Sequence, residues 1–396
     1  MFLRAYRFRL YPTELELVLL AKTFGCCRFV YNHFLNEKQK HYAEHKKSLS
    51  YGECSKMLAL LKVIHPWLKE VSSVALQQSL RHLESAFGKF YKRQAKFPKF
   101  KKRCHQQGVT FMRNAFTFKG GEITLAKCKT PLNIRWSRRF NGEPTSITIS
   151  KDCQGRYYIS ILVEEVIKPL PVATKTVGID LGLTHAITTS DGTKERHSIF
   201  LKAELKRLKR KQQVLSRKKK SSSNRKKARI ELSKISSKIR DKRLDTLHKT
   251  SMLLVNENQV ICAETLDVKK MMKNKYLARS IGDAGWGTLL SFLKYKSEWY
   301  GREFVQIDQY FPSSKLCSHC KGINEALTLG DRIWTCPKCN TEHDRDVTAA
   351  INIEEEGLRQ INWRTVGHTG NKACGADVRP TWQSRGQLAK KQELGL

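Results

Sequence analysis

The chain has 396 residues, and its 74 Lys and Arg against 36 Asp and Glu give a formal net charge of +38. This charge requires an anionic partner, either nucleic acid or a membrane surface, while an apolar content of 40% excludes wholesale disorder. Because no apolar run approaches the roughly 18 residues that span a bilayer and the N-terminus has no signal-peptide core, we expect a cytoplasmic, nucleoid-associated protein that binds nucleic acid and no membrane.

The first hundred residues combine one strand with a helical block. Residues 2–10 alternate basic with apolar or aromatic side chains, which predicts an amphipathic strand. Thr13 and Glu16 have the spacing of a capping box and predict a helix start. Apolar residues then recur at helical spacing over 15–35 and again over 76–90. We therefore expect a helical module over 13–103.

Three residues of this helical module are candidates for contact with duplex DNA: Tyr51, Gln77 and Arg81. Gln77 and Arg81 lie off the apolar stripe, and both residue types can read base edges through paired hydrogen bonds. They could equally be plain surface residues, and the sequence leaves that alternative open.

A β pattern follows the helical module. From about 109 to 166 apolar residues alternate on either side of turn signals, which predicts a small β module. The N-terminal strand is expected to join it. We therefore predict a small β-barrel from residues 1–12 and 104–170, with the helical module inserted into it.

The next unit is expected to cover residues 172–311. It begins with a buried strand that holds Asp180. Further strands are predicted over 185–189, 198–201, 259–266 and 304–311, and a helix is predicted over 286–300. The tail over 358–396 is Gly-rich and polar, and we expect it to be disordered.

A strongly basic stretch interrupts this unit. Residues 202–250 hold 20 Lys or Arg against 4 Asp or Glu, and leucine and isoleucine spacing predicts a two-helix hairpin over 201–250. Six basic residues crowd its tip and are predicted to contact phosphates: Lys218, Lys219, Lys220, Arg225, Lys226 and Lys227. The plain alternative is a solvated charged coiled coil.

Two C-x2-C pairs stand fifteen residues apart: Cys317, Cys320, Cys336 and Cys339. Four thiolates can bind one zinc ion in a tetrahedron, so a structural zinc ribbon is predicted over 312–342. Four cysteine ligands leave no open position for catalysis. His319 and His343 are interpreted as neighbours rather than ligands, and the other eight cysteines as mostly reduced.

Three acidic residues form the second candidate site. Asp180 interrupts an apolar strand, Glu264 ends another, and Asp346 opens a helix. Converging carboxylates could hold two divalent cations about 4 Å apart for phosphodiester hydrolysis, and hard oxygen ligands suit Mg²⁺. Separately, these residues could be a turn acid, a solvated strand end and a helix N-cap.

These motifs resemble those of a known family. VGIDLGL, CAETLDVKKM, YFPSSKLC, WTCPKC and HDRDVTAAINI are similar, in order and over about 1–356, to motifs of the TnpB family. These are transposon-encoded nucleases related to type V CRISPR effectors. The resemblance implies an α/β multidomain protein with an RNase H-like (RuvC) core, an inserted zinc ribbon and a return to the core over 343–357. It also implies that Asp180, Glu264 and Asp346 form the acidic triad.

The resemblance also implies an activity and its partners. It indicates a metal-dependent endonuclease with a guide RNA from the transposon end, and double-stranded DNA targets beside a short transposon-adjacent motif. A companion transposase is a further candidate partner. Alternatives are a nuclease-inactive RNA-guided repressor, a strand-joining or accessory transposition protein, and a zinc-ribbon RNA-binding scaffold. Thr348 and Lys321 depart from the family's usual Asn and Gly.

Overall fold

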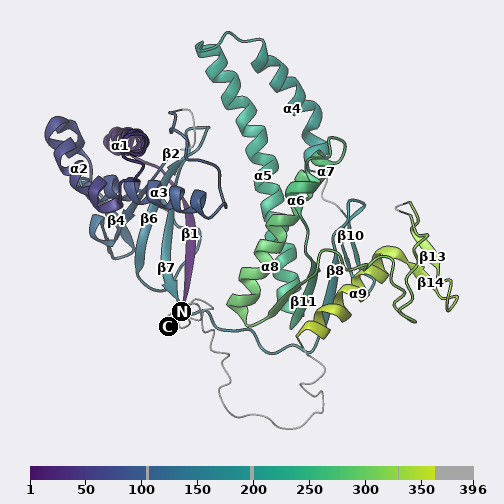
Figure 1. The fold of residues 1–396 in the computed structure, drawn as a ribbon. Helices are drawn as coiled ribbons and strands as arrows, with labels where there is room; N and C mark the ends of the chain where they lie inside the picture. Colours follow the sequence, from purple (N-terminus) through teal and green to yellow (C-terminus); the bar gives the residue numbers. More distant parts are fainter. Residues whose placement is uncertain (104–106, 197–199, 329, 362–396) are drawn as a thin grey trace, which may run out of the picture.

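The computed structural model describes residues 1–103, 107–196, 200–328 and 330–361. Two α/β halves lie side by side, and a long helical hairpin rises between them (Figure 1). Most of the predicted tail, from residue 362 on, lies outside the described residues, as do Cys104 and Cys374. Within the described residues, no helix has the length and apolar character needed to cross a membrane.

The N-terminal half is built on a five-stranded antiparallel sheet of order β2-β6-β7-β1-β5. Its strands are β1 (Phe2–Leu10), β2 (Gln107–Met112), β5 (Ile134–Arg135), β6 (Pro144–Lys151) and β7 (Tyr157–Glu165), and a separate hairpin joins β3 (Phe116–Lys119) to β4 (Glu122–Leu125). The N-terminal strand therefore does join the later β segment, pairing with β7 along its whole length. A barrel requires the two edge strands of a sheet to pair with each other. In this sheet β2 and β5 are the edges, so the barrel stays a prediction.

Three helices pack on this sheet and share one core with it: α1 (Glu14–His45), α2 (Tyr51–Ile64) and α3 (Ser73–Tyr91), with a 3-10 turn over Pro66–Glu70. The predicted capping box forms, because the Thr13 hydroxyl accepts from the Glu16 amide at 3.4 Å and the Glu16 carboxylate accepts from the Thr13 amide at 2.8 Å. Helix α2 was not predicted, since its apolar positions leave Leu60, Val63 and Ile64 exposed and so form no clear inward stripe.

The second half contains a five-stranded mixed sheet of order β10-β9-β8-β11-β12. Its strands are β8 (Thr176–Asp180), β9 (His185–Thr189), β10 (Lys194–Arg196), β11 (Val260–Glu264) and β12 (Glu303–Ile307). Strands β8, β11 and β12 run parallel, whereas β9 is antiparallel to both β8 and β10. Helices α5 (Ser223–Glu257) and α8 (Trp286–Tyr300) cover one face, and α9 (Arg345–Gln360) covers the other.

One strand prediction was wrong. The sequence predicted a strand over 198–201, of which 198–199 lie outside the described residues, whereas 200–201 belong to helix α4 (Phe200–Ser216); the third strand of this sheet in chain order is β10. Strand β10 consists of Lys-Glu-Arg and carries no apolar signal, so its pairing with β9 decides its conformation. Helices α4 and α5 form the predicted hairpin, with its turn over 217–222.

Candidate active site

Two of the predicted acids sit at the ends of neighbouring parallel strands. Ile179 of β8 pairs with Ala263 of β11, so Asp180 and Glu264 are the next residues along at the same edge of the sheet. The residues before them are buried, whereas the two acids are only partly buried. Parallel strands thus deliver both carboxylates to one edge, where the apolar interior ends.

Helix α9 supplies the third acid, and a glycine permits its approach. A Cβ on Gly178 of β8 would lie 2.0 Å from the carbonyl oxygen of Ala350 and 2.7 Å from the amide of Glu354. The helix therefore rests directly on the strand, with Asp346 in its first turn beside the edge that carries Asp180.

The helix N-cap is Asp344 rather than Asp346. The Asp344 carboxylate accepts from the amides of Asp346 and Val347 at 3.1 and 3.2 Å, and Lys194 donates to its other oxygen at 2.6 Å. The N-cap interpretation of Asp346 was therefore wrong. Capping by Asp344 leaves the Asp346 side chain free for other partners.

The charges of Glu264 and Asp346 act on the Asp180 carboxylate. Burial and, to a smaller extent, the charges of Glu264 and Asp346 together raise the pKa of Asp180 to about 7, while the charge of Arg345 opposes this rise. Like charges held this close disfavour ionisation. A bound cation would neutralise the negative charge of these carboxylates, and their oxygen atoms suit a hard cation such as Mg²⁺.

Three further residues surround the acids, and sequence reasoning did not identify them. Arg332 donates to Asp346 at 3.1 Å and to the Thr184 hydroxyl at 3.2 Å. The Nδ1 atom of His185 lies 3.8 Å from an Asp346 oxygen, and the Ser313 hydroxyl donates to Glu264 at 2.7 Å. Only Ser313 fell within a motif, YFPSSKLC; the other two are single polar residues without a spacing signal.

The four cysteines of the predicted zinc site come together. All four Sγ atoms lie within 4.8 Å of one another, with Cys317 3.6 Å from Cys339 and Cys320 3.5 Å from Cys336. A zinc ion with bonds of about 2.3 Å needs sulfur pairs about 3.8 Å apart, so this donor set fits zinc. Hydrogen bonding by Thr341 lowers the pKa of Cys339 to about 5, which favours the thiolate that binds metal.

The backbone adopts the same conformation directly after each of the two cysteine pairs. Lys321 and Asn340 each follow the second cysteine of a pair, and both have left-handed backbone, with φ of 57° and 60°. A short hairpin of β13 (Ile333–Thr335) and β14 (Glu342–Asp344) adjoins them. His343 is buried, with Nε2 3.0 Å from the Cys317 sulfur, whereas His319 is exposed.

The tip of the α4–α5 hairpin divides the six predicted phosphate contacts into two groups. The five lysines are exposed, whereas Arg225 is half-buried. Arg225 donates to the carbonyls of Leu215 and Lys218 at 2.7 and 2.8 Å, so it ties the turn to the end of α4. The structure therefore places Arg225 in the turn rather than free on its surface.

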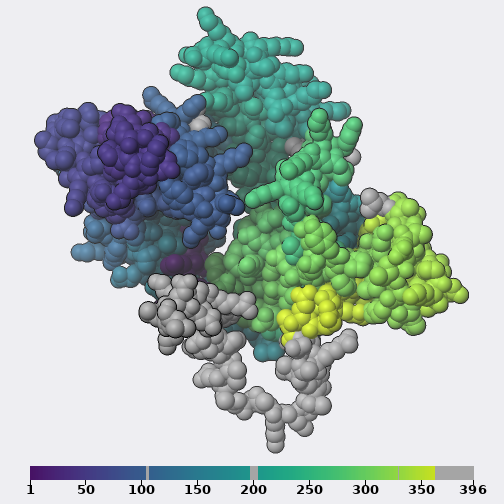
Figure 2. Space-filling view, viewed as in Figure 1, coloured from purple at the N-terminus to yellow at the C-terminus, as the bar shows by residue number. Residues whose placement is uncertain are grey.

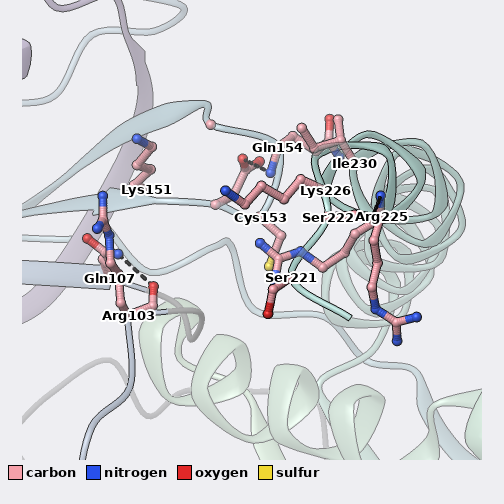
Figure 3. Close-up of a pocket in the computed structure, with 13 residues that line it drawn as sticks. Arg103, Gln107, Lys151, Cys153, Gln154, Ser221, Ser222, Arg225, Lys226 and Ile230 are labelled. Carbon is pink, nitrogen blue, oxygen red and sulfur yellow. Dashed lines mark hydrogen bonds between the residues drawn. The ribbon is translucent and has the colours of Figure 1, made fainter. Parts of the chain in front are cut away.

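A basic cleft of about 690 Å³ separates the hairpin from the N-terminal sheet. Arg103 and Lys151 line the sheet side, and Lys226 lines the hairpin side (Figure 3). At its margin Gln154 donates to Ser233 and Ser237 of α5, at 3.2 and 2.8 Å, and so connects the halves. The predicted DNA contacts lie apart from this cleft: the Arg81 guanidinium sits 5.1 Å from the Tyr51 ring centroid, and Gln77 is exposed.

Three family models match the chain: "Helix-turn-helix domain" over 1–47, "Probable transposase" over 159–275, and "Cas12f1-like, TNB domain" over 286–353. Over 1–47 the structure instead has β1 and the single helix α1.

Relatives cover nearly the whole chain. A proposed RNA-guided DNA endonuclease of Streptomyces pristinaespiralis is 43% identical over 98% of this chain and 96% of its own length. The proposed RNA-guided DNA endonuclease InsQ of Escherichia coli is 30% identical over 90% of this chain and 92% of its own. A Cas12f1 chain, solved by cryo-EM with sgRNA and target DNA, shares the fold at a TM-score of 0.54 and 13% identity, covering 89% of this chain and 98% of that one.

Proposed function

The chain belongs to the TnpB family of RNA-guided DNA endonucleases, and on that premise we propose that Asp180, Glu264 and Asp346 are its catalytic acids. The function of the chain is that of a transposon-encoded, RNA-guided DNA endonuclease. The observation that carries the site assignment is that adjacent parallel strands end in Asp180 and Glu264, and that the charges of Glu264 and Asp346 both act on the Asp180 carboxylate.

The proposed reaction is metal-dependent phosphodiester hydrolysis. Two bound Mg²⁺ ions would activate a water molecule and stabilise the leaving oxygen. Asp180, Glu264 and Asp346 would hold these ions, and the positive charge of the ions would favour the ionised form of Asp180, which burial and the two neighbouring acids disfavour. Arg332 donates to Asp346 in the structure, so it would have to share that carboxylate or move aside.

The core is proposed to be RNase H-like. The support is its strand order, three antiparallel strands followed by two parallel ones, with acids at the ends of β8 and β11. The cysteine cluster between β12 and α9 is proposed to be a ribbon with one structural zinc. Its sulfur spacing and its four-thiolate composition support that proposal.

Guide RNA and target DNA are the proposed partners. The net charge of +38 supports a polyanionic ligand, and base pairing by a guide leaves the protein to read duplex shape and a short flanking motif. Tyr51, Gln77 and Arg81 remain candidates for that flanking motif. A companion transposase and a nucleoid location remain predictions from the family resemblance.

Single substitutions of the acids test the proposed site. Asp180→Ala, Glu264→Ala and Asp346→Ala should each abolish Mg²⁺-dependent cleavage of a guide-matched DNA while leaving RNA binding intact. Glu257→Ala is the matched control, since Glu257 is an exposed acid at the end of α5. A triad variant that cuts at the wild-type rate would remove its residue from the site. If the wild-type protein does not cleave the guide-matched DNA at all, the alternative of a nuclease-inactive repressor is favoured.

A further inference from the structure

A loop with one buried serine connects the cysteine cluster to the acids. This loop, residues 312–316, lies between β12 and Cys317. Ser313 is 5% exposed, and its hydroxyl donates to Oε1 of Glu264 at 2.7 Å. Of the two Glu264 carboxylate oxygens, this contact fixes one and leaves the other available as a ligand.

Helix α9 holds this loop through Asn352. The Asn352 side chain is 1% exposed, and its Nδ2 donates to the carbonyls of Ser313 and Leu316 at 2.8 and 2.7 Å. Both amide hydrogens are thus used on one loop. Because Asp346 and Asn352 lie on the same helix, the loop that orients Glu264 is fixed relative to the third acid.

The same loop is continuous with the first cysteine pair. Leu316 bridges to Ile323, and the Cys317 amide donates to the Gly322 carbonyl at 2.9 Å. On the other side of the pair, Lys321 donates to Glu355 of α9. The first cysteine knuckle is therefore held to α9 at two places, by Asn352 and by Lys321.

We propose that Ser313 is a positioning residue for Glu264, and that Asn352 and the cysteine knuckle hold Ser313 in place, so that zinc in the cluster favours divalent-cation binding at the acids. This inference rests on the proposed function of the acids. Partners that orient a metal ligand through a hydrogen bond typically change metal affinity or activity by about 10–100-fold when removed. A merely structural role for Ser313 would change stability and leave cation affinity alone.

Direct Mn²⁺ titration of the nucleic-acid-free protein, followed by electron paramagnetic resonance, measures the cation affinity without relying on cleavage. Ser313→Ala should weaken Mn²⁺ binding by about 10–100-fold, with zinc content unchanged. Ser313→Thr retains the hydroxyl and should bind Mn²⁺ more tightly than Ser313→Ala. The matched control is Ser314→Ala, since Ser314 is partly buried in the same loop but makes none of the contacts described here.

Zinc removal tests whether the cysteine cluster affects cation binding at the acids through Ser313. Stripping zinc from the wild-type protein with a chelator should weaken Mn²⁺ binding, whereas stripping it from Ser313→Ala should add little, because the two changes break one path. Fully additive effects would overturn the coupling. Mn²⁺ affinity within twofold of wild type in Ser313→Ala would overturn the positioning role.

Two variants, Glu264→Gln and Ser313→Ala, distinguish an error in the role of Ser313 from an error in the proposed function of the acids. If Glu264→Gln still binds Mn²⁺ and cleaves like the wild type, the assignment of the acids is wrong. If Glu264→Gln loses both while Ser313→Ala loses neither, the acids stand and only the role of Ser313 is refuted.

Discussion

Lys321 stands in a backbone conformation that suits glycine. Its φ of 57° lies in the left-handed region, where a side chain costs about 1 kcal/mol or more. Ion pairing with Glu355 and a 2.8 Å bond to the Ser318 carbonyl offset part of that cost. The departure from the usual glycine is therefore a compromise between backbone strain and a tie to α9.

We expect Lys321→Gly to be more stable than Lys321→Ala by about 1 kcal/mol, because both lose the ion pair and only glycine removes the strain. Thermal unfolding of the zinc-loaded variants measures the difference. Equal melting temperatures would show that the left-handed geometry is not maintained in solution.

Lys296 is a buried cation without a carboxylate among its described partners. It is 7% exposed and donates to the His248 carbonyl and the Ser251 hydroxyl, each at 2.7 Å. Burial lowers its pKa to about 8 from the usual 10.5. Between these values the unfolded chain binds more protons than the native one, so this residue makes stability rise with pH.

From pH 7 to pH 10, the wild-type protein should therefore gain about 2 kcal/mol of unfolding free energy relative to Lys296→Met. Urea unfolding of both proteins at the two pH values gives the comparison. If the difference in unfolding free energy between the two proteins is the same at both pH values, Lys296 keeps an ordinary pKa.

Among the elements, α9 depends most on one small residue. It contacts β8 where a Cβ on Gly178 would meet backbone at 2.0 Å, and neither backbone can yield as a flexible side chain would. Gly178→Ala should cost about 3 kcal/mol and move Asp346 away from Asp180. Circular dichroism melts and Mn²⁺ titration measure the two effects.

Gly88→Ala serves as the control for that substitution. Gly88 lies within α3, and a Cβ there meets no atom within 4 Å, so alanine should be neutral or slightly stabilising. A Gly178→Ala protein that melts like Gly88→Ala would contradict the close approach of α9.

The elements of the second half were largely predictable, and the reasons are local. Strand β9 and helix α8 match their predicted ranges, β9 with two β-branched threonines beside its isoleucine and α8 with apolar residues at helical spacing. Strand β10 was missed because it is polar. The Asp344 cap was missed because Asp344 and Asp346 both stand near the start of the helix, and the sequence does not tell which of the two carboxylates accepts from the first-turn amides.

At the scale of the molecule, the hairpin lysines are the exposed part of a large positive charge. Changing Lys218, Lys219, Lys220, Lys226 and Lys227 to Gln should weaken nucleic-acid binding and flatten its salt dependence, by roughly 0.7–0.9 in log–log slope for each lost phosphate contact. Filter binding across a salt series measures the slope.

Arg225→Gln provides the contrast, since Arg225 binds carbonyls of the turn. We expect it to loosen the turn and to leave the salt slope nearly unchanged. If Arg225→Gln lowers the slope as much as a lysine change does, the arginine contacts phosphate after all.

The site as a whole was only partly predictable. The cysteines could be proposed because their spacing restricts the chemistry, and the acids because each stands at a predicted strand end or helix start and matches a motif of the resembling family. Arg332 could not, because it is one of 74 basic residues and reaches Asp346 only through the fold. The link from Gln154 to α5 likewise joins segments far apart in the chain.

The pairing of β1 has a consequence for the synthesis of this protein. Strand β1 is translated well before β7, yet Leu10 pairs with Tyr157 and Phe2 with Glu165. At roughly 5–20 residues per second, the nascent strand waits on the order of ten seconds for its partner. During that interval it has an unpaired edge, which is open to chaperones or to aggregation. A message truncated before codon 157 would therefore yield a fragment in which β1 lacks β7, its main partner, and can pair only with the short strand β5.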